Sequence, residues 1–180
     1  MPIQNRPSII AITGPAGSGK STIARFLFDH YGYARVRFAD PLKSMLGSLG
    51  LSEYELEGQG KDLPCELLGG HTPRYAMKSL GTEWGRDMMS KTFWSDAWVR
   101  RVGHAVGAYI VAEDLRFPDP EEFVVRLMGG IIWRVERPGY GGTDTHPSET
   151  EQMHIKYDVL FHNDSTPEYL FEQVRKELED

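Results

Sequence analysis

The stretch Gly14-Pro15-Ala16-Gly17-Ser18-Gly19-Lys20-Ser21 fits the GxxxxGK(S/T) pattern of a phosphate-binding loop at every fixed position. It follows the short apolar run Ile9-Ile10-Ala11-Ile12 and precedes residues 23–30, whose apolar positions recur at helical spacing. The motif requires this order of strand, loop and helix. We therefore predict that the loop binds the phosphates of a nucleoside triphosphate.

Glycines in such a loop let the backbone turn its N–H groups toward the phosphates, and the following helix adds partial positive charge at its N-terminus. Lys20 is expected to reach the β- and γ-phosphates, and Ser21 is expected to ligate Mg²⁺. A glycine-rich turn that simply opens a helix is the alternative, but such a turn does not require the motif's fixed residues together. The expected ATP-binding residues in this segment are Gly14, Ala16, Gly17, Ser18, Gly19, Lys20, Ser21 and Thr22.

The chain has 180 residues, a length that suits one domain with a single core. Its net charge of −6 argues against a surface that binds nucleic acid polymers, so we expect a small phosphorylated substrate instead. No apolar run is long enough to span a bilayer and no signal peptide is recognisable, so we expect a cytoplasmic protein without a membrane partner. Cys65 is the only cysteine, which excludes an intrachain disulfide and a zinc site made of several thiolates.

Segments of strand and helix character alternate along the chain, which predicts an α/β fold with a doubly wound parallel sheet. The five expected strands are Ile9–Ile12, Ala34–Phe38, Ala108–Glu113, Ile131–Glu136 and Val159–His162. Helices are expected between them, over about residues 20–30, 74–89, 94–105 and 121–128. A last helix is expected after Ser165 and Glu168, which have capping-box spacing.

Two irregular insertions interrupt the expected single domain, which spans residues 1–180. The first, at about residues 40–89, is expected to bind the phosphoryl acceptor. Its part from Leu49 to Pro73 shows no sustained period and is expected to be mobile. The second insertion, at about residues 138–152, has the Gly-, Thr- and Pro-rich composition of a lid. Such a lid would exclude water from the γ-phosphate of the donor.

Charged residues follow the expected strands at the edge where open α/β sheets bind ligands. Asp40 and Lys43 follow the second strand, although Asp40 also suits the N-cap of a helix that Pro41 begins. Asp114 and Arg116 follow the third strand, at a spacing that points both side chains to one face of an extended segment. Their alternative role is an ion pair that ends the strand.

Four stretches outside the loop are distinctive: Phe38-Ala39-Asp40-Pro41-Leu42-Lys43, Leu80-Gly81-Thr82-Glu83-Trp84-Gly85-Arg86, Asp114-Leu115-Arg116-Phe117-Pro118 and Asp144-Thr145-His146-Pro147-Ser148-Glu149. With the phosphate loop and Asn163-Asp164, they resemble the deoxynucleoside monophosphate kinases found chiefly in tailed bacteriophages, over nearly the whole chain. The resemblance implies a P-loop NTPase-type fold of the nucleoside monophosphate kinase group. It also implies Mg²⁺-dependent transfer of the ATP γ-phosphate to a deoxynucleoside monophosphate, in the host-cell cytoplasm if a phage encodes the chain. A homodimer is compatible with it.

The phosphate loop, the strand ends and this resemblance together give expected roles for individual residues. The expected catalytic residues are Lys20, Asp114, Arg116, Arg134 and Arg137, with Ser21 and Asp114 as metal ligands and Asn163 added to the ATP-binding set. The expected acceptor-binding residues are Asp40, Lys43, Trp84, Arg86 and Glu149. The Trp84 ring can stack on a base while the Arg86 guanidinium binds the α-phosphate in a fork. A tryptophan packed in the core is the alternative for Trp84.

The expected lid departs from the wider kinase group. Lids of ordinary adenylate kinases contain several arginines, whereas residues 139–155 here contain neither arginine nor lysine. The catalytic cations must therefore come from Arg116, from Arg134 and Arg137 at the base of the lid, or from Lys156. His146 is a further lid candidate, for which a hydrogen-bonding hinge role is the alternative.

Two other functions remain open from the sequence. A kinase that resembles phosphomevalonate kinase or dephospho-coenzyme A kinase would share the loop and the asparagine ending of the last strand. A GTP switch or a non-catalytic ATP-binding module would belong to a different class. The switch is disfavoured because Asn163-Asp164-Ser165 lacks the lysine of an NKxD base-recognition stretch.

Overall fold

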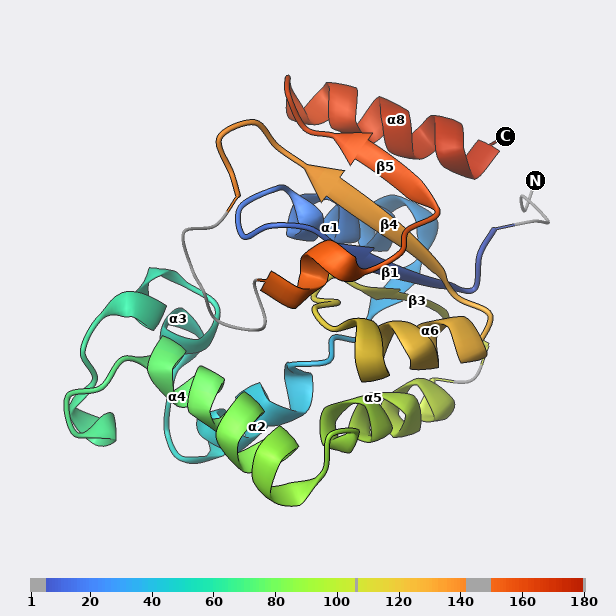
Figure 1. The fold of residues 1–180 in the computed structure, drawn as a ribbon. Coiled ribbons are helices and arrows are strands. Elements are labelled where there is room, and N and C mark those ends of the chain that lie inside the picture. Colours follow the sequence, from blue (N-terminus) through green and yellow to red (C-terminus); the bar gives the residue numbers. More distant parts are fainter. Residues whose placement is uncertain (1–5, 106, 142–149, 180) are drawn as a thin grey trace. The chain divides into compact units, whose positions relative to one another are not determined.

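The computed structural model describes residues 6–105, 107–141 and 150–179 (Figure 1). The chain divides into two compact units. Met1–Arg37 and Arg101–Asp180 form the first, which we call the sheet unit, and Phe38–Arg100 forms the second, which we call the helical unit. The helical unit contains the stretch of about residues 40–89 that is expected to bind the acceptor, and it extends beyond it.

The sheet unit is built on five parallel strands in the order β2-β3-β1-β4-β5. The strands are β1 (Ile9–Thr13), β2 (Tyr33–Arg35), β3 (Tyr109–Ala112), β4 (Ile131–Glu136) and β5 (Val159–His162). β1 is central, because Ile10 pairs with Val111 of β3 on one side and with Ile131 of β4 on the other. The all-parallel sheet with flanking helices confirms the predicted α/β fold.

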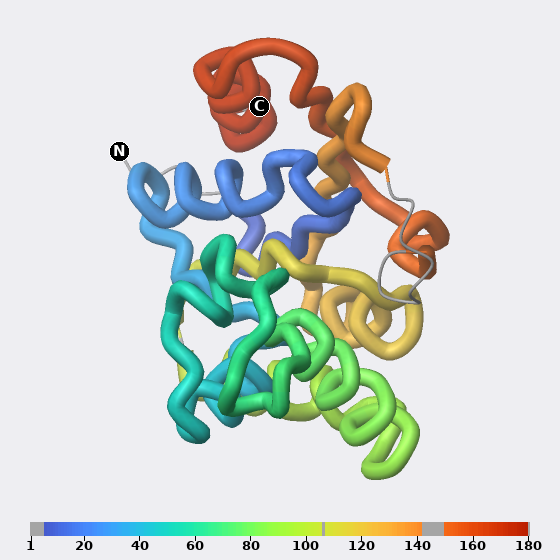
Figure 2. The backbone as a smooth tube through the Cα atoms, turned by 90° about the vertical axis from the view of Figure 1, so that its left-hand side faces the viewer, coloured from blue at the N-terminus to red at the C-terminus, as the bar shows by residue number. Residues whose placement is uncertain are grey.

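Helices α1 (Lys20–Tyr31) and α8 (Pro167–Glu179) lie side by side (Figures 1 and 2). Both pack on the sheet face to which alternate strand residues point, so they close a common core. Its largest members include Ile10, Ile12, Ile23, Leu27, Val111, Trp133, Phe161, Leu170 and Val174. The remaining described helical segments of this unit are η4 (Pro118–Glu122), α6 (Phe123–Leu127) and η5 (Glu151–His154).

β2 differs from its prediction, because it ends at Arg35 instead of Phe38. Val36 N still donates to the carbonyl of Val111 at 3.0 Å, but no further residue continues the strand. Phe38 instead stacks on Trp98 within the helical unit, with ring centroids 4.6 Å apart. Phe38, one of the apolar residues that suggested a longer strand, therefore packs outside the sheet.

The start of α8 also differs from its prediction. Thr166 Oγ1 accepts a hydrogen bond from Tyr169 N at 3.3 Å, and the Thr166 carbonyl accepts one from Leu170 N at 3.2 Å. Thr166 therefore caps the helix, and the predicted capping box of Ser165 and Glu168 is wrong by one residue. Pro167 takes the first helical position, where its missing N–H costs nothing.

The helical unit consists of short helices around its own core. They are α2 (Asp40–Ser48), α3 (Glu53–Leu56), η1 (Gln59–Asp62), η2 (Glu66–Leu68), α4 (Pro73–Ser79), the π-helix η3 (Leu80–Met89) and most of α5 (Phe93–His104). The buried core residues are Leu42, Leu46, Leu51, Leu56 and Trp94. None of the helices in the described ranges has both the length and the apolar character that crossing a bilayer requires.

The segment from Leu49 to Pro73 contains defined helical turns, so the expectation of an irregular stretch is wrong. Ser52 caps α3 and forms a capping box with Glu55, and Leu51 and Leu56 on either side are buried. Turns of three or four residues are too short for hydrophobic periodicity to reveal. The order of this segment comes from caps and from a few buried leucines.

Candidate active site

The phosphate loop depends on glycine at three positions. Gly14, Gly17 and Gly19 have φ angles of 135°, 76° and 112°, in the left-handed region that other residues rarely adopt. A Cβ on Gly14 would lie only 2.3 Å from the carbonyl oxygen of Val135 in β4. The loop can therefore keep this shape and this distance from the sheet only with glycine.

Asn163, directly after β5, supports the same loop from the other side. Its Nδ2 donates to the carbonyl of Ser18 at 2.8 Å, and its backbone N donates to the carbonyl of Glu136 at 2.8 Å. A Cβ on Gly19 would lie 2.6 Å from Nδ2 of Asn163. The structure thus brings Asn163 to the loop, and its contact with ATP stays a prediction.

Two hydroxyl groups of the loop region are buried without a hydrogen-bond partner among the described residues. They are Oγ1 of Thr13, at the end of β1, and Oγ of Ser18. Buried polar atoms are normally hydrogen-bonded, so these two retain unused bonding capacity at the loop. Such capacity, beside a glycine cradle at a helix N-terminus, fits the binding of phosphate oxygens.

Lys20 is held over the loop by the loop's own backbone. The side chain is only 7% exposed, and Nζ donates to the carbonyls of Gly14 and Pro15, both at 2.6 Å. The ammonium is therefore placed within the loop in advance, as its expected role requires.

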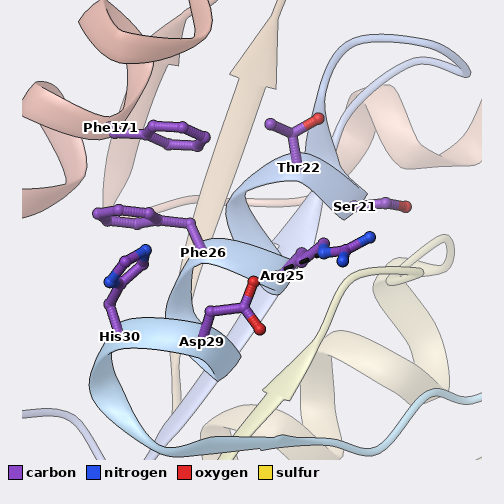
Figure 3. Close-up of a pocket in the computed structure, with 7 residues that line it drawn as sticks. All are labelled: Ser21, Thr22, Arg25, Phe26, Asp29, His30 and Phe171. Atoms are coloured by element: carbon purple, nitrogen blue, oxygen red, sulfur yellow. Dashed lines mark ion pairs between the residues drawn. The ribbon is translucent and has the colours of Figure 1, made fainter.

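Ser21 and Thr22 form the exposed first turn of α1 and open into a cavity of about 400 Å³ (Figure 3). The cavity runs along α1 past Arg25, Phe26, Asp29 and His30, and Phe171 of α8 lines its other side. The rings of Phe26 and Phe171 stack with centroids 4.4 Å apart. The two hydroxyl-bearing residues thus remain accessible at one end of a pocket that charged and aromatic side chains line together.

Asp114 and Arg116 follow β3 beside the start of the phosphate loop. The intervening Leu115 donates its N–H to the carbonyl of Ile12 in β1 at 3.3 Å, which places this turn next to the loop. Leu115 is buried, whereas Asp114 and Arg116 are partly exposed. This alternation of partly exposed and buried residues agrees with the prediction that the Asp114 and Arg116 side chains lie on the same side of the segment. The strand itself ends at Ala112, one residue before its predicted end at Glu113.

Glu121 holds this turn in place, a role that no sequence pattern indicated. Its carboxylate is 2% exposed and accepts hydrogen bonds from the backbone N of Arg116 at 2.8 Å and of Phe117 at 3.2 Å. A carboxylate a few residues after a turn carries no sequence signal for such bonds. Glu121 fixes the backbone from which the Arg116 side chain projects.

Glu113 is a second buried carboxylate that sequence reasoning missed. It is 4% exposed, and its Oε1 accepts hydrogen bonds from Nε of Arg35 at 3.1 Å and from Nη2 of the same residue. Burial raises the pKa of the Glu113 carboxyl above its ordinary value, and the hydrogen bond from Arg35 opposes that rise. The pair joins β2 to the turn that carries Asp114.

The two arginines of β4 and its end have different surroundings. Arg134 is mostly buried, with Nε donating to Glu136 Oε1 at 2.9 Å and Nη1 donating to the carbonyl of Gln152 at 3.2 Å. Arg137 is exposed and lies at the phosphate loop, where its Nη1 donates to the carbonyl of Gly17 at 3.4 Å. Of the two predicted cations, Arg137 is therefore the one that adjoins the loop.

Tyr140, which no sequence pattern indicated, also takes part in the contact between Arg137 and the phosphate loop. The Arg137 guanidinium lies 4.4 Å from the centre of its ring, and the two residues form an antiparallel bridge. A Cβ on Gly17 would lie 2.6 Å from the Tyr140 ring. The turn after β4 thus covers the tip of the phosphate loop.

In the helical unit, the LGTEWGR stretch is shaped by Trp94. The indole Nε1 donates to the carbonyl of Gly81 at 2.7 Å, and a Cβ on Gly85 would lie 2.3 Å from the same nitrogen. Trp84 is partly buried, and its ring packs edge-on against Phe93 with centroids 5.3 Å apart. This packing supports the core role for Trp84, and its stacking on a base stays a prediction.

The other predicted acceptor residues lie on α2 and η3. Asp40 is the first residue of α2 after the N-cap Ala39, so the interpretation of Asp40 as the cap is wrong. Lys43 Nζ donates to both carboxylate oxygens of Glu57 at 2.9 Å. Arg86 is partly exposed on η3. Glu149 and His146 lie outside the described residues, as does most of the predicted lid.

Ser21 and Asp114 present the hard oxygen ligands that Mg²⁺ prefers. Among the described residues, no group of three His, Cys, Asp or Glu side chains could hold a metal ion. Such a cage is unnecessary for Mg²⁺, which usually takes one or two protein ligands together with substrate phosphates and water. The residues present therefore fit a phosphate-bound Mg²⁺.

Comparison with known proteins agrees with this geometry. The chain is 33% identical to a protein of Acanthamoeba polyphaga mimivirus, provisionally named a deoxynucleotide monophosphate kinase, over 92% of this chain and 93% of that protein. It is 39% identical over 54 residues to a cytidylate kinase of Natronomonas pharaonis, a match that covers 30% of this chain and 28% of that kinase. No protein-family profile matches the chain.

Solved structures share the fold. Shikimate kinase from Aquifex aeolicus superposes with a TM-score of 0.52 and 14% identity, over 95% of this chain and 96% of the kinase. TT1252 from Thermus thermophilus superposes with a TM-score of 0.50 and 19% identity, over 97% of both chains. At such identities the likeness concerns the fold alone, and it agrees with the parallel sheet and its flanking helices.

Proposed function

The chain belongs to the deoxynucleotide monophosphate kinase family represented by the mimivirus protein, and we propose that it transfers the γ-phosphate of ATP to a deoxynucleoside monophosphate. The products are ADP and the deoxynucleoside diphosphate. The observation that carries the proposal is the extent of the match, 33% identity over 92% of this chain and 93% of the relative.

On the donor side, Lys20 exchanges the carbonyls of Gly14 and Pro15 for oxygens of the β- and γ-phosphates. Phosphoryl transfer depends mainly on positioning and on stabilising charge, so a cation already placed in the loop lowers the barrier directly. Ser21 and Asp114 would hold Mg²⁺, which when bound neutralises charge on the phosphate oxygens. Asn163 keeps the loop backbone in its binding shape.

Arg116 and Arg137 are the side chains we assign to the transferring phosphoryl group. Arg116 projects from a turn that Glu121 fixes beside the loop, and Arg137 already contacts the loop at Gly17. Arg134 was an equal candidate from the sequence. Its bonds to Glu136 and Gln152 favour a role in holding β4 and η5 together.

On the acceptor side, we assign the nucleotide to the helical unit, with Asp40, Lys43, Trp84 and Arg86 as contacts and Glu149 as a contribution from the lid. The exposed part of the Trp84 ring would stack on the base, and every base offers a π-face for such stacking. The Arg86 guanidinium would bind the α-phosphate in a fork. We therefore expect several deoxynucleoside monophosphates to be accepted.

A coupled assay of ADP release tests the proposal. Purified protein is incubated with ATP and Mg²⁺ and with each of the four common deoxynucleoside monophosphates, phosphomevalonate or dephospho-coenzyme A. Release of ADP that depends on deoxynucleoside monophosphates is the expected result. Release of ADP only with phosphomevalonate or dephospho-coenzyme A would show that this compound is the acceptor instead. ATP binding without any release of ADP would indicate a non-catalytic ATP-binding module.

A further inference from the structure

Lys61 is a partly buried cation on η1 in the helical unit. Within the part of the chain that the structure describes, it forms no hydrogen bond and no ion pair. Two acids lie near it, but each is bonded to another cation. Glu57 binds Lys43 through both oxygens at 2.9 Å, and Asp62 accepts from Nε and Nη2 of Arg74 at 2.5 and 2.9 Å.

The charges around Lys61 leave its ammonium poorly compensated. Burial lowers the pKa of Lys61 below its ordinary value, and repulsion from Lys43 and Arg74 lowers it further. Glu57 and Asp62 act on the pKa in the opposite direction without reversing the change. An incoming anion would meet three cations and would relieve the repulsion among them.

The turn that carries Lys61 is packed tightly against α3. A Cβ on Gly60 would lie 2.7 Å from the ring of Tyr54, and a Cβ on Gly58 would lie 2.7 Å from the Tyr54 carbonyl oxygen. Gly58 and Gly60 thus let η1 pack directly on Tyr54. This contact fixes the backbone that carries Lys61, so little ordering of that backbone remains to be done on binding.

We propose that Lys61, flanked by Lys43 and Arg74, is a binding site for a phosphate monoester dianion in the helical unit. Its ligand in the reaction is the monophosphate group of the acceptor, and this identification rests on the proposed function. A lysine ammonium offers three hydrogen-bond donors and a guanidinium offers five, so the group can serve several phosphate oxygens while both ion pairs persist. Lys61 thereby joins Lys43, which the sequence had already assigned to the acceptor.

A purely structural lysine would behave differently when it is removed. If Lys61 stabilised the fold, Lys61→Met would lower the melting temperature. If Lys61 is held against its neighbours' repulsion for the sake of binding, the substitution should leave the melting temperature unchanged or raise it. This readout separates the two roles without any substrate.

The binding test uses inorganic phosphate and lysine side chains labelled with ¹³C for NMR. The signal that is missing from both Lys61→Met and Lys61→Arg identifies Lys61 in the wild-type protein. We expect phosphate to shift this signal saturably, and the signal of exposed Lys91 to stay unmoved. A Lys61 signal that phosphate leaves in place would overturn the site, and the measurement on wild type does not require either variant to be active.

The kinetic test uses deoxynucleoside monophosphates with wild type, Lys61→Met, Lys61→Arg and the control Lys91→Met. We expect Lys61→Met to raise the acceptor KM at least about tenfold, the loss of about 1.4 kcal/mol of binding, with the ATP KM unchanged. Lys61→Arg should keep the acceptor KM within about threefold of wild type. An acceptor KM unchanged in Lys61→Met would refute the role in acceptor binding.

The two proposals fail in different ways. If wild type phosphorylates no deoxynucleoside monophosphate but phosphate shifts the Lys61 signal, the proposed function is wrong and the anion site stands. If wild type turns over these acceptors but the Lys61 signal and the Lys61→Met acceptor KM do not change, the function stands and the anion site is wrong.

Discussion

The phosphate loop of the sheet unit and the proposed anion site of the helical unit, which consists of Lys43, Lys61 and Arg74, are built in different ways. In the loop, the φ angles suit only glycine, a Cβ would meet its neighbours at 2.3 to 2.6 Å, and one lysine completes the site. In the helical unit, Lys43, Lys61 and Arg74 come from α2, η1 and α4, and no motif links them. A backbone site is therefore readable from sequence, whereas a site made of side chains on separate elements is not.

This difference also predicts whether a substitution changes the chemical step or the binding of one substrate. A change in the loop should stop the chemical step, because in the proposed mechanism the loop holds the group that is transferred. A change among the side chains of the helical unit should weaken one substrate and leave the chemistry of the bound complex largely intact. Substitutions ordered by expected effect test this division.

The largest effect is expected for Lys20→Ala. The substitution removes the ammonium at the transferring phosphate, so kcat should fall by at least about 10³-fold. The variant should stay folded, with a melting temperature only a few degrees lower, because the two hydrogen bonds lost are worth about 0.5–1.5 kcal/mol each. Steady-state kinetics and thermal unfolding measure both, with exposed Lys176→Ala as the control for a lost charge. Near-normal turnover in a folded variant would remove the loop from the mechanism.

Arg116→Ala should have the next largest effect, a fall in kcat of at least about a hundredfold. Its control is Arg25→Ala, which removes a surface arginine paired with Asp29 at 3.5 Å. Such exposed pairs contribute about 0 to 1 kcal/mol, so the control should keep wild-type kcat. Equal kcat values for the two variants would make Arg116 a structural residue.

Asp114→Asn tests the predicted role of Asp114 as a ligand of Mg²⁺. The substitution keeps the size of the side chain but removes its charge, so a higher Mg²⁺ concentration should be needed for half-maximal activity. A titration of activity against Mg²⁺ at saturating ATP measures the change. An unaltered Mg²⁺ dependence together with an unaltered acceptor KM would assign Asp114 to the structure of the turn.

Arg86→Lys tests the helical unit and should affect the acceptor alone. Lysine keeps the positive charge but loses the planar fork, so the acceptor KM should rise about tenfold while the ATP KM and kcat change little. Initial rates over a matrix of both substrate concentrations measure the two constants separately. A larger effect on the ATP KM would move Arg86 to the donor side and break the division between the units.

The smallest effect is expected for Glu113→Gln, which should change how the free energy of unfolding depends on pH. Because the folded-state pKa of Glu113 is raised above its ordinary 4.5, the native state binds this proton more tightly than the unfolded chain does. The resulting stability is complete below the unfolded pKa and is lost as pH rises through the folded pKa.

We therefore expect the free energy of unfolding of wild type, relative to Glu113→Gln, to fall as pH rises from about 4.5 toward neutral. Urea unfolding at several pH values measures the difference, and exposed Glu172→Gln controls for the lost charge. A difference that does not vary with pH would show that Arg35 compensates the burial completely.

The sequence predicted the parts of the fold that have a period or a backbone rule. β4 and β5 match their predicted ranges, and the phosphate loop lies between β1 and α1 as expected. The sequence could not predict Glu113, Glu121 or Tyr140, because each acts through a contact that depends on the folded turn around it. The helical turns of the segment from Leu49 to Pro73 were not predicted either, because they too depend on contacts that form only in the folded chain.

The most direct test of the proposed transfer is to follow the γ-phosphate itself. Wild-type protein is incubated with Mg²⁺, [γ-³²P]ATP and a deoxynucleoside monophosphate, and the labelled products are separated. We predict label in the deoxynucleoside diphosphate, with none formed by Lys20→Ala or without the acceptor. Label that appears only in inorganic phosphate, at a rate that the deoxynucleoside monophosphate does not change, would contradict the proposed transfer.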